Sequence, residues 1–167
     1  LFNRLARLGV DRADAASSVI GVQAQRLIRC LCPQCREVSR ATDQHRHYVE
    51  RYKKRLESNL DPEAGCGDAK ALIEIFGQWL VAGDTYRSSG CAACNHTGYH
   101  RQTAAMEIYL VGNDPEALDM LYDGKPISTM QKHFDRQGYL TVASQMMRMF
   151  ARHETTYAEI EPYIPLL

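Results

Sequence analysis

The stretch Cys91-Ala-Ala-Cys-Asn-His-Thr-Gly-Tyr99 places two cysteines three positions apart and follows them with a Thr-Gly turn. A CxxC turn of this kind directs two thiolates to the same side, which makes half of a tetrahedral metal site. The other half is Cys32-Pro-Gln-Cys35. We therefore predict that Cys32, Cys35, Cys91 and Cys94 hold one zinc ion. Four protein ligands leave no open coordination position, so the zinc is expected to be structural rather than catalytic.

The two cysteine pairs are separated by 55 residues, many more than in a compact zinc ribbon. Because the loop-closure penalty grows only logarithmically with length, this separation predicts a folded insertion between the pairs. The alternative is two unrelated pairs of buried thiols. A thioredoxin-like redox role has little support, since neither pair sits at a strand-to-helix junction of a βαβ unit.

Three further residues near the pairs are weaker candidates. Cys30 lies two positions from Cys32, which is the wrong spacing for a metal knuckle, and is expected to pack inward. Cys66 is interpreted as a spare thiol in a loop. His96 either donates a hydrogen bond to a thiolate or is exposed to solvent.

The composition is that of an ordinary globular protein. The chain has 167 residues, of which 45% are hydrophobic and 24% charged, enough for one sizeable core or two small ones. The formal net charge is zero, so nothing global favours nucleic acid or an anionic membrane as a partner. No apolar run approaches the ~20 residues needed to cross a bilayer, and no signal peptide is visible. The chain starts without Met, inside a helical pattern, which predicts a cut within a longer protein.

Hydrophobic spacing predicts two helices before the first cysteine pair. One covers Leu1 to Leu8 and stops at Gly9. The next is capped by Asp11 or Asp14, and its apolar stripe consists of Ala16, Ile20, Ala24 and Leu27, at intervals of three and four. Pro33 then ends the helix.

The rest of the chain predicts more helices and one strand. Helices are expected at 43–58 and 69–80, a strand at 103–111, and a further helix after Asp114-Pro115. The fold class is therefore α+β and mostly helical, with a short sheet beside the cysteines and a C-terminal helical bundle.

Two capping boxes and a methionine-rich segment mark the last helices. Ser128 with Gln131, and Thr156 with Glu159, have the capping-box spacing. Between them, the segment 140–153 is rich in methionine and is interpreted as part of the core.

No catalytic constellation is present in the sequence. It has no Gly-rich phosphate loop with Lys and Ser/Thr, and no acidic cluster for magnesium. None of the isolated histidines has a nucleophile near it in sequence; these are His45, His47, His100, His133 and His153. We expect the chain by itself to catalyse nothing.

Four strings, in order, resemble the type II secretion and type IV pilus assembly ATPases. They are "LFNRLARLGV" (1–10), "ASSVIGVQAQRLIRCLCPQC" (16–35), "GCAACNHTGY" (90–99) and "QGYLTVASQMMRMFARHETTYAEI" (137–160). The resemblance implies the C-terminal portion of a hexameric ATPase, located in the bacterial cytoplasm and peripheral at the inner membrane. Such a protein uses ATP and magnesium and works with an inner-membrane platform protein. Its Walker A and Walker B motifs are absent here.

The resemblance also implies a division of the chain. Residues 1–29 would be the end of a RecA-like ATPase core, 30–112 a tetracysteine subdomain with a helical insertion at 43–80, and 113–167 a C-terminal helical subdomain. The four cysteines match the metal cysteines of the family. Gln25-Arg26 matches its Gln-Arg pair, to which we assign a structural role.

The sequence departs from the family pattern in three places. His100-Arg101-Gln102 replaces the usual Gly-Arg pair, although Glu107 still matches the family's Glu. The tail lacks the Gly that is common before Thr155-Thr156. The insertion is unusually long, which suggests a divergent branch such as a conjugation-plasmid or type IVB pilus system.

A different class of function is a zinc-ribbon module that binds nucleic acid. The segment from Arg26 to Glu57 supports it, with nine Lys/Arg against four Asp/Glu and with Tyr48 and Tyr52 interleaved. A solvated helix face explains the same charges, and the zero net charge opposes nucleic-acid binding. A chaperone-like zinc domain is ruled out because only two CxxC pairs exist and its glycine pattern is missing.

Overall fold

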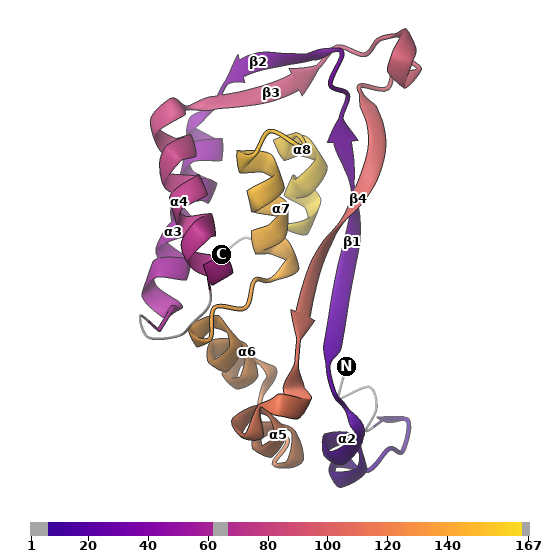
Figure 1. Cartoon of the computed structure of the whole chain (residues 1–167), viewed down its shortest axis with the longest axis vertical. Coiled ribbons are helices and arrows are strands. Elements are labelled where there is room, and N and C mark those ends of the chain that lie inside the picture. Colours follow the sequence, from indigo (N-terminus) through magenta and orange to yellow (C-terminus); the bar gives the residue numbers. More distant parts are fainter. Residues whose placement is uncertain (1–6, 62–66, 165–167) are drawn as a thin grey trace.

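The computed structural model describes residues 7–61 and 67–164, and confirms an α+β chain (Figure 1). The helix expected at Leu1–Leu8 falls almost entirely outside these residues, as does Cys66. The helices are α2 (Arg12–Ser18), α3 (Asp43–Asn59), α4 (Gly67–Ala82), α5 (Pro115–Tyr122), α6 (Ile127–Arg136), α7 (Val142–Ala151) and α8 (Tyr157–Ile160). The strands are β1 (Val22–Leu31), β2 (Arg36–Arg40), β3 (Asp84–Ser88) and β4 (Tyr99–Tyr109).

The strands form two antiparallel ribbons of different length. β1 pairs with β4 from Val22 opposite Tyr109 to Leu31 opposite Tyr99, with an irregularity after Cys30; we call this the long ribbon. β2 pairs with β3 over five residues each, and this is the short ribbon. Figure 1 shows both ribbons starting from the same corner, the long one running beside the helices and the short one crossing their end.

The helix expected to continue through Leu27 is wrong. α2 ends at Ser18, and the chain continues as strand β1. The apolar side chains at helical spacing are not the buried ones: Ile20 is 77% exposed and Leu27 60% exposed. The buried residues are instead Ile28 and Cys30, which alternate as on a strand. Pairing with β4, which is remote in sequence, therefore outweighs the local pattern.

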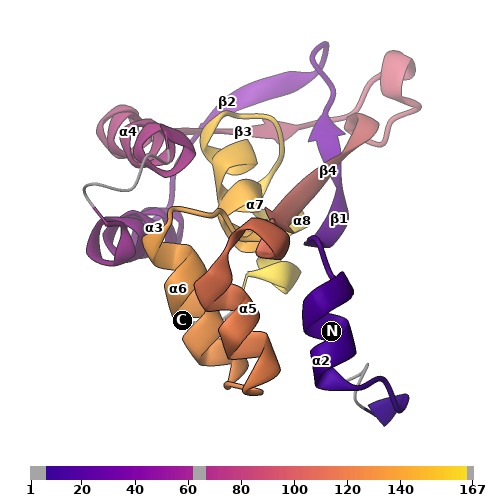
Figure 2. The same ribbon diagram turned by 60° about the horizontal axis from the view of Figure 1, so that its bottom comes forward.

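The main core surrounds α7. Met146, Met147 and Phe150 are fully buried, so the methionine-rich segment is core, as predicted. Figure 1 shows α7 between the α3–α4 pair and the long ribbon, and these supply the other large core residues, Ile28, Tyr52, Leu72, Phe76 and Trp79. A smaller cluster holds α5 and α6 against the far end of β4; it consists of Tyr109, Val111, Ala117, Leu121, Met130 and Phe134. Figure 2 shows these two helices at the end of the molecule away from the short ribbon.

The helices of the insertion and the strand before Asp114 were predicted correctly. α3 and α4 cover the two expected helices, and the expected strand lies within and just beyond β4. Asp114 caps α5 by accepting a hydrogen bond from the Ala117 N–H at 3.0 Å. Thr156 caps α8 in the same way, by accepting from the Glu159 N–H.

The capping box expected at Ser128 is wrong. α6 already begins at Ile127, directly after Pro126, so Ser128 lies inside the first turn. Proline presets the backbone angle φ for a helix start, which moves the start one residue ahead of the serine.

The α7 start has a cap that the sequence did not reveal. The Val142 N–H donates to the carboxylate of Glu107 on β4 at 2.8 Å, and the Thr141 hydroxyl accepts from the Ser144 N–H. Glu107 therefore ties the long ribbon to the central helix. Among the described residues, none of the helices has the length and apolar character required to cross a bilayer.

Candidate metal centre

The four predicted cysteines meet at the corner where the two ribbons start. Cys32 follows β1 and Cys35 precedes β2, while Cys91 and Cys94 lie between β3 and β4. Their four sulfur atoms all lie within 4.8 Å of one another. The distances across the pairs are 4.0 Å for Cys32–Cys91 and 3.8 Å for Cys35–Cys94, and none of the described cysteines forms a disulfide. Among the described residues this is the only such cluster of candidate ligands.

These distances fit a tetrahedral zinc ion. With Zn–S bonds of ~2.3 Å, four sulfurs at the corners of a tetrahedron are about 3.8 Å apart. The Cys91–Cys94 separation is also 3.8 Å, so three of the contacts match within a few tenths of an ångström. Two unrelated pairs of thiols would not converge in this way. The four cysteines are therefore positioned to bind a metal ion.

The backbone after Cys91 turns sharply to bring the second pair into place. Both the Cys94 and the His96 N–H groups donate to the Cys91 carbonyl, at 3.1 and 2.8 Å. Asn95 and His96 adopt positive φ angles of 50° and 59°. Gly98 has a φ of +80° and leaves room for the Ser88 hydroxyl, which a Cβ would approach to 2.8 Å. The Thr-Gly turn is thus part of the knuckle itself.

Hydrogen bonds from the backbone stabilise the thiolate form of Cys94. The Cys91 N–H donates to its sulfur at 3.2 Å, and the Gly98 N–H donates at 3.3 Å. The bond from Cys91 is the largest influence and, together with that from Gly98, it outweighs burial and lowers the pKa of Cys94 to about 6. N–H donors to sulfur stabilise a thiolate, which is the form that binds metal.

The pKa of Cys35 is shifted in the other direction. The Ser88 hydroxyl, 3.1 Å from its sulfur, acts to lower the pKa of Cys35, but burial and the neighbouring thiols outweigh it and raise the pKa to about 11. A divalent cation bound between the sulfurs would favour their deprotonated, thiolate form.

The other predicted candidates lie outside the cluster. Cys30 is 3% exposed and packs in the main core, as expected, and burial raises the pKa of its thiol. The His96 side chain is exposed, and among the described residues it makes no hydrogen bond to a cysteine sulfur. Gln25 and Arg26 are exposed on β1, more than five positions before the first metal cysteine.

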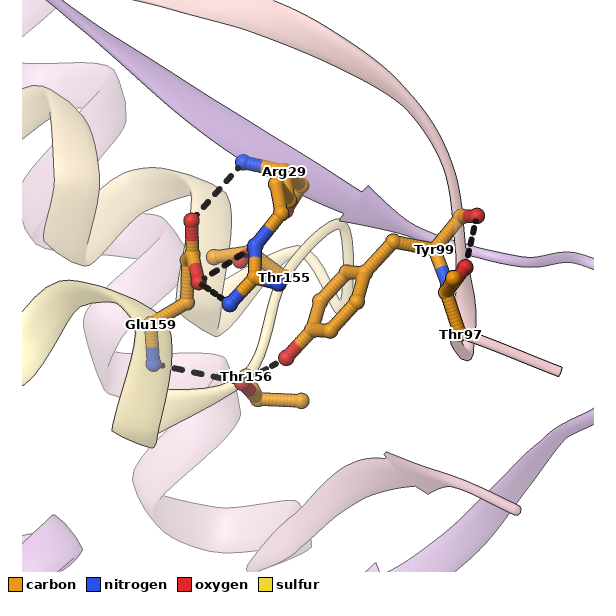
Figure 3. A network of polar contacts seen from close by, with 6 residues as sticks. All are labelled: Arg29, Thr97, Tyr99, Thr155, Thr156 and Glu159. Atoms are coloured by element: carbon orange, nitrogen blue, oxygen red, sulfur yellow. Dashed lines mark hydrogen bonds and ion pairs between the residues drawn. The ribbon is translucent and has the colours of Figure 1, made fainter. Parts of the chain in front are cut away.

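A polar network next to the cluster fastens the C-terminal segment to both strands of the long ribbon (Figure 3). On β1, the Arg29 N–H and guanidinium both donate to the Glu159 carboxylate, and the Arg29 carbonyl accepts from the Thr155 hydroxyl at 2.8 Å. On β4, the Tyr99 hydroxyl pairs with that of Thr156 at 2.9 Å. Burial alone would raise the pKa of Glu159, but the bonds from Arg29 outweigh it and lower that pKa.

Sequence reasoning found the cysteines and the Thr-Gly turn but missed their other supports. Ser88 and the Arg29–Glu159 pair carry no motif of their own, because they are recognised only by what lies beside them in space. Thr156 and Glu159 were assigned to one capping box; the threonine caps, but the Glu159 carboxylate reaches Arg29 instead.

The geometry defines a class of protein: an α+β unit in which two antiparallel ribbons meet at a tetracysteine cluster. Comparison with known proteins makes this more specific. Residues 1–161 match the family described as "Type II/IV secretion system protein". The chain belongs to this family, which includes type II secretion and type IV pilus assembly ATPases. The resemblance recognised in the sequence is confirmed.

The similarity to individual members of the family supports the same assignment. The chain is 31% identical over 130 residues to the type II secretion system ATPase E of Vibrio cholerae, covering 78% of this chain and 20% of that protein. It is 27% identical over 157 residues to HxcR of Pseudomonas aeruginosa, covering 94% and 24%. With the type IV pilus assembly ATPase PilB of Thermus thermophilus it shares 26% over 157 residues, covering 94% and 15%. The chain spans about a fifth of the length of these curated relatives.

Proposed function

We propose that this chain is the zinc-bearing C-terminal part of a hexameric, cytoplasmic ATPase that powers protein secretion or type IV pilus assembly. The part itself is non-catalytic, while the full-length protein binds ATP and magnesium. Cys32, Cys35, Cys91 and Cys94 hold a structural zinc ion. The single observation that carries the proposal is the convergence of these four sulfurs in a chain of the secretion ATPase family.

The division of the chain follows from the same view. Residues 1–29 complete the RecA-like ATPase core, 30–112 form the zinc subdomain, and 113–167 form the C-terminal helical subdomain. The zinc joins the end of β1 to the start of β4, at the end of the ladder that already pairs the two strands. In this role the unit supports assembly of the hexamer and offers a docking surface to an inner-membrane platform protein.

The direct test measures bound metal and stability together. Purified chain is analysed for zinc by mass spectrometry, and its thermal unfolding is recorded, for wild type and Cys32→Ser. Cys30→Ala is the matched control, because this buried thiol is two residues from Cys32 but outside the cluster. One zinc per chain, lost with thermal stability in Cys32→Ser and retained in Cys30→Ala, supports the proposal. Absence of metal with all cysteines freely titratable contradicts it.

The motor assignment has its own test in the full-length protein. Zinc removal by Cys35→Ser is expected to weaken assembly and ATPase activity, since the cluster joins segments on either side of the insertion. If activity and assembly are unchanged without zinc, a supporting role of this unit in the motor is excluded.

The nucleic-acid alternative is less well supported. Much of the positive charge on α3 is already paired: Lys53 with Glu57 and Arg55 with Asp135. The Arg46 guanidinium donates to the Leu80 carbonyl. A steep dependence of DNA or RNA affinity on salt concentration would revive this alternative.

A further inference from the structure

A cavity lies beneath the short ribbon, beside the metal centre. Its volume is about 390 Å³, and its walls are the short ribbon, the start of α3, the turn after Cys94 and the start of α8. In Figure 1 these elements lie together in the upper half of the molecule. All the lining residues fall between positions 39 and 158, so this chain builds the cavity from its own segments. The size is that of a small-molecule site, since such pockets start at about 300 Å³.

Ser and Thr hydroxyl groups make up much of the cavity wall. Four of these hydroxyls already have partners within the protein; they belong to Thr42, Ser88, Thr97 and Thr156. Figure 3 shows one of them, the Thr156 hydroxyl, paired with that of Tyr99. Two more hydroxyls belong to Ser39 and Thr85, and neither makes a hydrogen bond to another residue that the structure describes.

The Thr85 hydroxyl is free although its side chain is almost fully buried. Thr85 is 6% exposed, and its oxygen is not among the buried polar atoms that are sealed off without a partner. The small exposed part of Thr85 therefore includes its hydroxyl, which opens on the cavity. Ser39 lies directly opposite Thr85 in the ladder, so the two side chains share one face of the ribbon. Here a ligand can supply hydrogen bonds that the protein leaves unmade.

His45 contributes a further donor to the cavity wall. Its Nδ1 accepts a hydrogen bond from the Thr42 N–H at 3.3 Å. Burial lowers the pKa of His45 and outweighs the opposing effect of Glu161, so the ring is neutral at pH 7. A neutral imidazole whose Nδ1 accepts carries its proton on Nε2. The Nε2–H is therefore a donor, and it has no partner among the described residues.

The charged groups that line the cavity are positive. They are Arg40 and Arg87, and none of the described lining residues is Asp or Glu. Each arginine has a carboxylate partner on the opposite strand, Asp84 or Glu37, in an exposed ion pair. Such pairs are weak, and a guanidinium has five N–H donors, so both arginines can also bind an anion.

The start of α3 adds to this positive character. Thr42, the cap of this 17-residue helix, lines the cavity, so the partial positive charge of the helix N-terminus lies at its wall. Asp43 in the first turn is exposed and is not a lining residue. Arg40 is only two positions before the cap, which places a full and a partial positive charge at the same end of the cavity.

These groups together suit a phosphate that carries a sugar. Guanidinium groups and helix N-termini are what proteins use to bind phosphate. Free Ser and Thr hydroxyls both donate and accept, as the hydroxyls of a sugar do. An inorganic ion would leave much of the cavity empty, and an uncharged sugar would not use the arginines.

We propose that the cavity beneath the short ribbon binds a sugar phosphate, with the phosphate at Arg40 and the start of α3 and the sugar hydroxyls at Ser39 and Thr85. Arg87 adds positive charge at the rim. The site goes beyond the proposed function, because its lining includes none of the four metal cysteines and nothing from residues 1–29. A free sugar phosphate and a nucleotide share this chemistry.

An NMR titration of the zinc-loaded chain tests the proposal. Ribose 5-phosphate is added at constant ionic strength and pH 7, with ribose and inorganic phosphate as separate controls. We expect saturable shifts of the amides of Arg40, Thr85 and residues 42–45, with a Kd of about 1 mM or below. Each control should bind at least about tenfold more weakly, since it uses only part of the site. No saturable shift at these amides up to about 20 mM overturns the proposal, and so does equally tight binding of inorganic phosphate.

The same titration with 5′-AMP separates the two sources of the ligand. Tighter binding of AMP than of ribose 5-phosphate supports the proposal and assigns the site to a nucleotide. Weaker binding of AMP, with ribose 5-phosphate bound, supports it and assigns the site to a free sugar phosphate.

Two substitutions locate the binding in the cavity. Thr85→Val removes the hydroxyl but keeps the shape of the side chain, and Arg40→Gln removes a cation whose side chain is 84% exposed. We expect each to weaken binding of ribose 5-phosphate about fivefold or more. Arg136→Gln is the matched control, because it removes an exposed arginine on α6, and it should change the affinity by less than about twofold.

Zinc content and melting temperature are recorded for all three variants. They show whether Thr85→Val still folds, and the exposed position of Arg40 keeps the test decisive if it does not. Unchanged affinity in the folded cavity variants overturns the proposal, because the ligand would then bind elsewhere. An equal loss of affinity in Arg136→Gln overturns it too, because net charge rather than the cavity would explain the binding.

Discussion

The two ribbons start at the same four cysteines but are stabilised in different ways. The long ribbon buries its inner face on α7 through residues such as Ile28 and Ala105, which are almost fully buried. The short ribbon has five-residue strands, and Val38 on it is 60% exposed. Both have antiparallel hydrogen bonding, yet a two-stranded ribbon alone is marginal in water. The comparison teaches that burial supports the long ribbon, whereas the short one depends on what closes its ends.

The ends of the short ribbon are closed by two different devices. At one end lies the cysteine cluster, where Ser88 contacts the Cys35 sulfur. At the other, the Ala41 N–H donates to the Gly83 carbonyl at 3.0 Å, where the ribbon joins α3 and α4. Removing either closure should therefore affect the short ribbon far more than the long one.

Metal removal should give the largest difference in stability between the two ribbons. A strong zinc chelator is expected to lower the free energy of unfolding by on the order of 5 kcal/mol or more, since structural zinc sites contribute ~10 kcal/mol or more in small domains. Amides of β2 and β3 should lose their protection from hydrogen exchange while those of β1 and β4 keep most of theirs. Equal loss in both ribbons would show that the long ribbon also depends on the cluster.

The second-largest loss of stability is expected from a change in the turn that carries the second cysteine pair. Gly90 has a φ of +82°, and a Cβ there would lie 2.6 Å from the His96 carbonyl oxygen. We expect Gly90→Ala to cost about 3 kcal/mol of stability, because backbone strain and a clash with backbone add. Gly9→Ala is the matched control: its φ is +83° with nothing within 4 Å, so only strain of about 1 kcal/mol is expected. Similar losses in chemical denaturation would mean that the clash relaxes.

The Arg29–Glu159 pair tests a contact that stabilises the long ribbon without involving the cysteines. Arg29 is half exposed while Glu159 is largely buried, so Glu159→Gln should lower stability by about 1 kcal/mol. Since folding lowers the pKa of Glu159 below its usual 4.5, this stabilisation is present above pH 4.5 and is lost as the pH falls through the lowered pKa. Thermal unfolding from pH 7 to pH 3 should show that the wild type loses its advantage over Glu159→Gln in acid. A constant difference would exclude this pair as the source.

The smallest effect is expected from the surface charges of the short ribbon. Arg87 pairs with Glu37 at 3.4 Å, with both side chains more than half exposed. Exposed pairs of this kind contribute little, so Arg87→Ala should change stability by less than about 0.5 kcal/mol. A double-mutant cycle with Glu37→Ala measures the coupling between them. A coupling above ~1 kcal/mol would show that charges, rather than closed ends, support the ribbon.

The sequence was sufficient to predict the cysteine cluster because the four cysteines carry their own spacing. Cys32-Pro-Gln-Cys35 and the second pair each form a local turn, and four thiols allow one arrangement around one ion. The insertion helices were equally predictable, since α3 begins at a Thr42 cap and α4 has continuous helical spacing. The turns and the helices are each determined by residues close together in sequence, so they could be predicted from local patterns.

The long ribbon was not predictable in the same way. Ile20, Ala24 and Leu27 have the spacing of a helix, but β1 forms because β4, more than 70 residues later, offers it a hydrogen-bonding partner. The bond from the Val142 N–H to Glu107 and the pairing of Glu159 with Arg29 are likewise contacts between residues far apart in sequence. No local pattern distinguishes them from other surface glutamates, so only the structure reveals them.

The pairing of Arg36 with Ser88 has a consequence for how such proteins can diverge. The entry and the exit of the 55-residue segment lie side by side, directly above the cysteines. A segment whose two ends meet can be lengthened, shortened or exchanged without displacing its anchor, and each doubling of its length adds only ~0.6 kcal/mol of closure entropy. The short ribbon is therefore a grafting point, at which evolution or an engineer can change the segment's length, provided that whatever stands in place of the α3–α4 pair still covers the core face of α7.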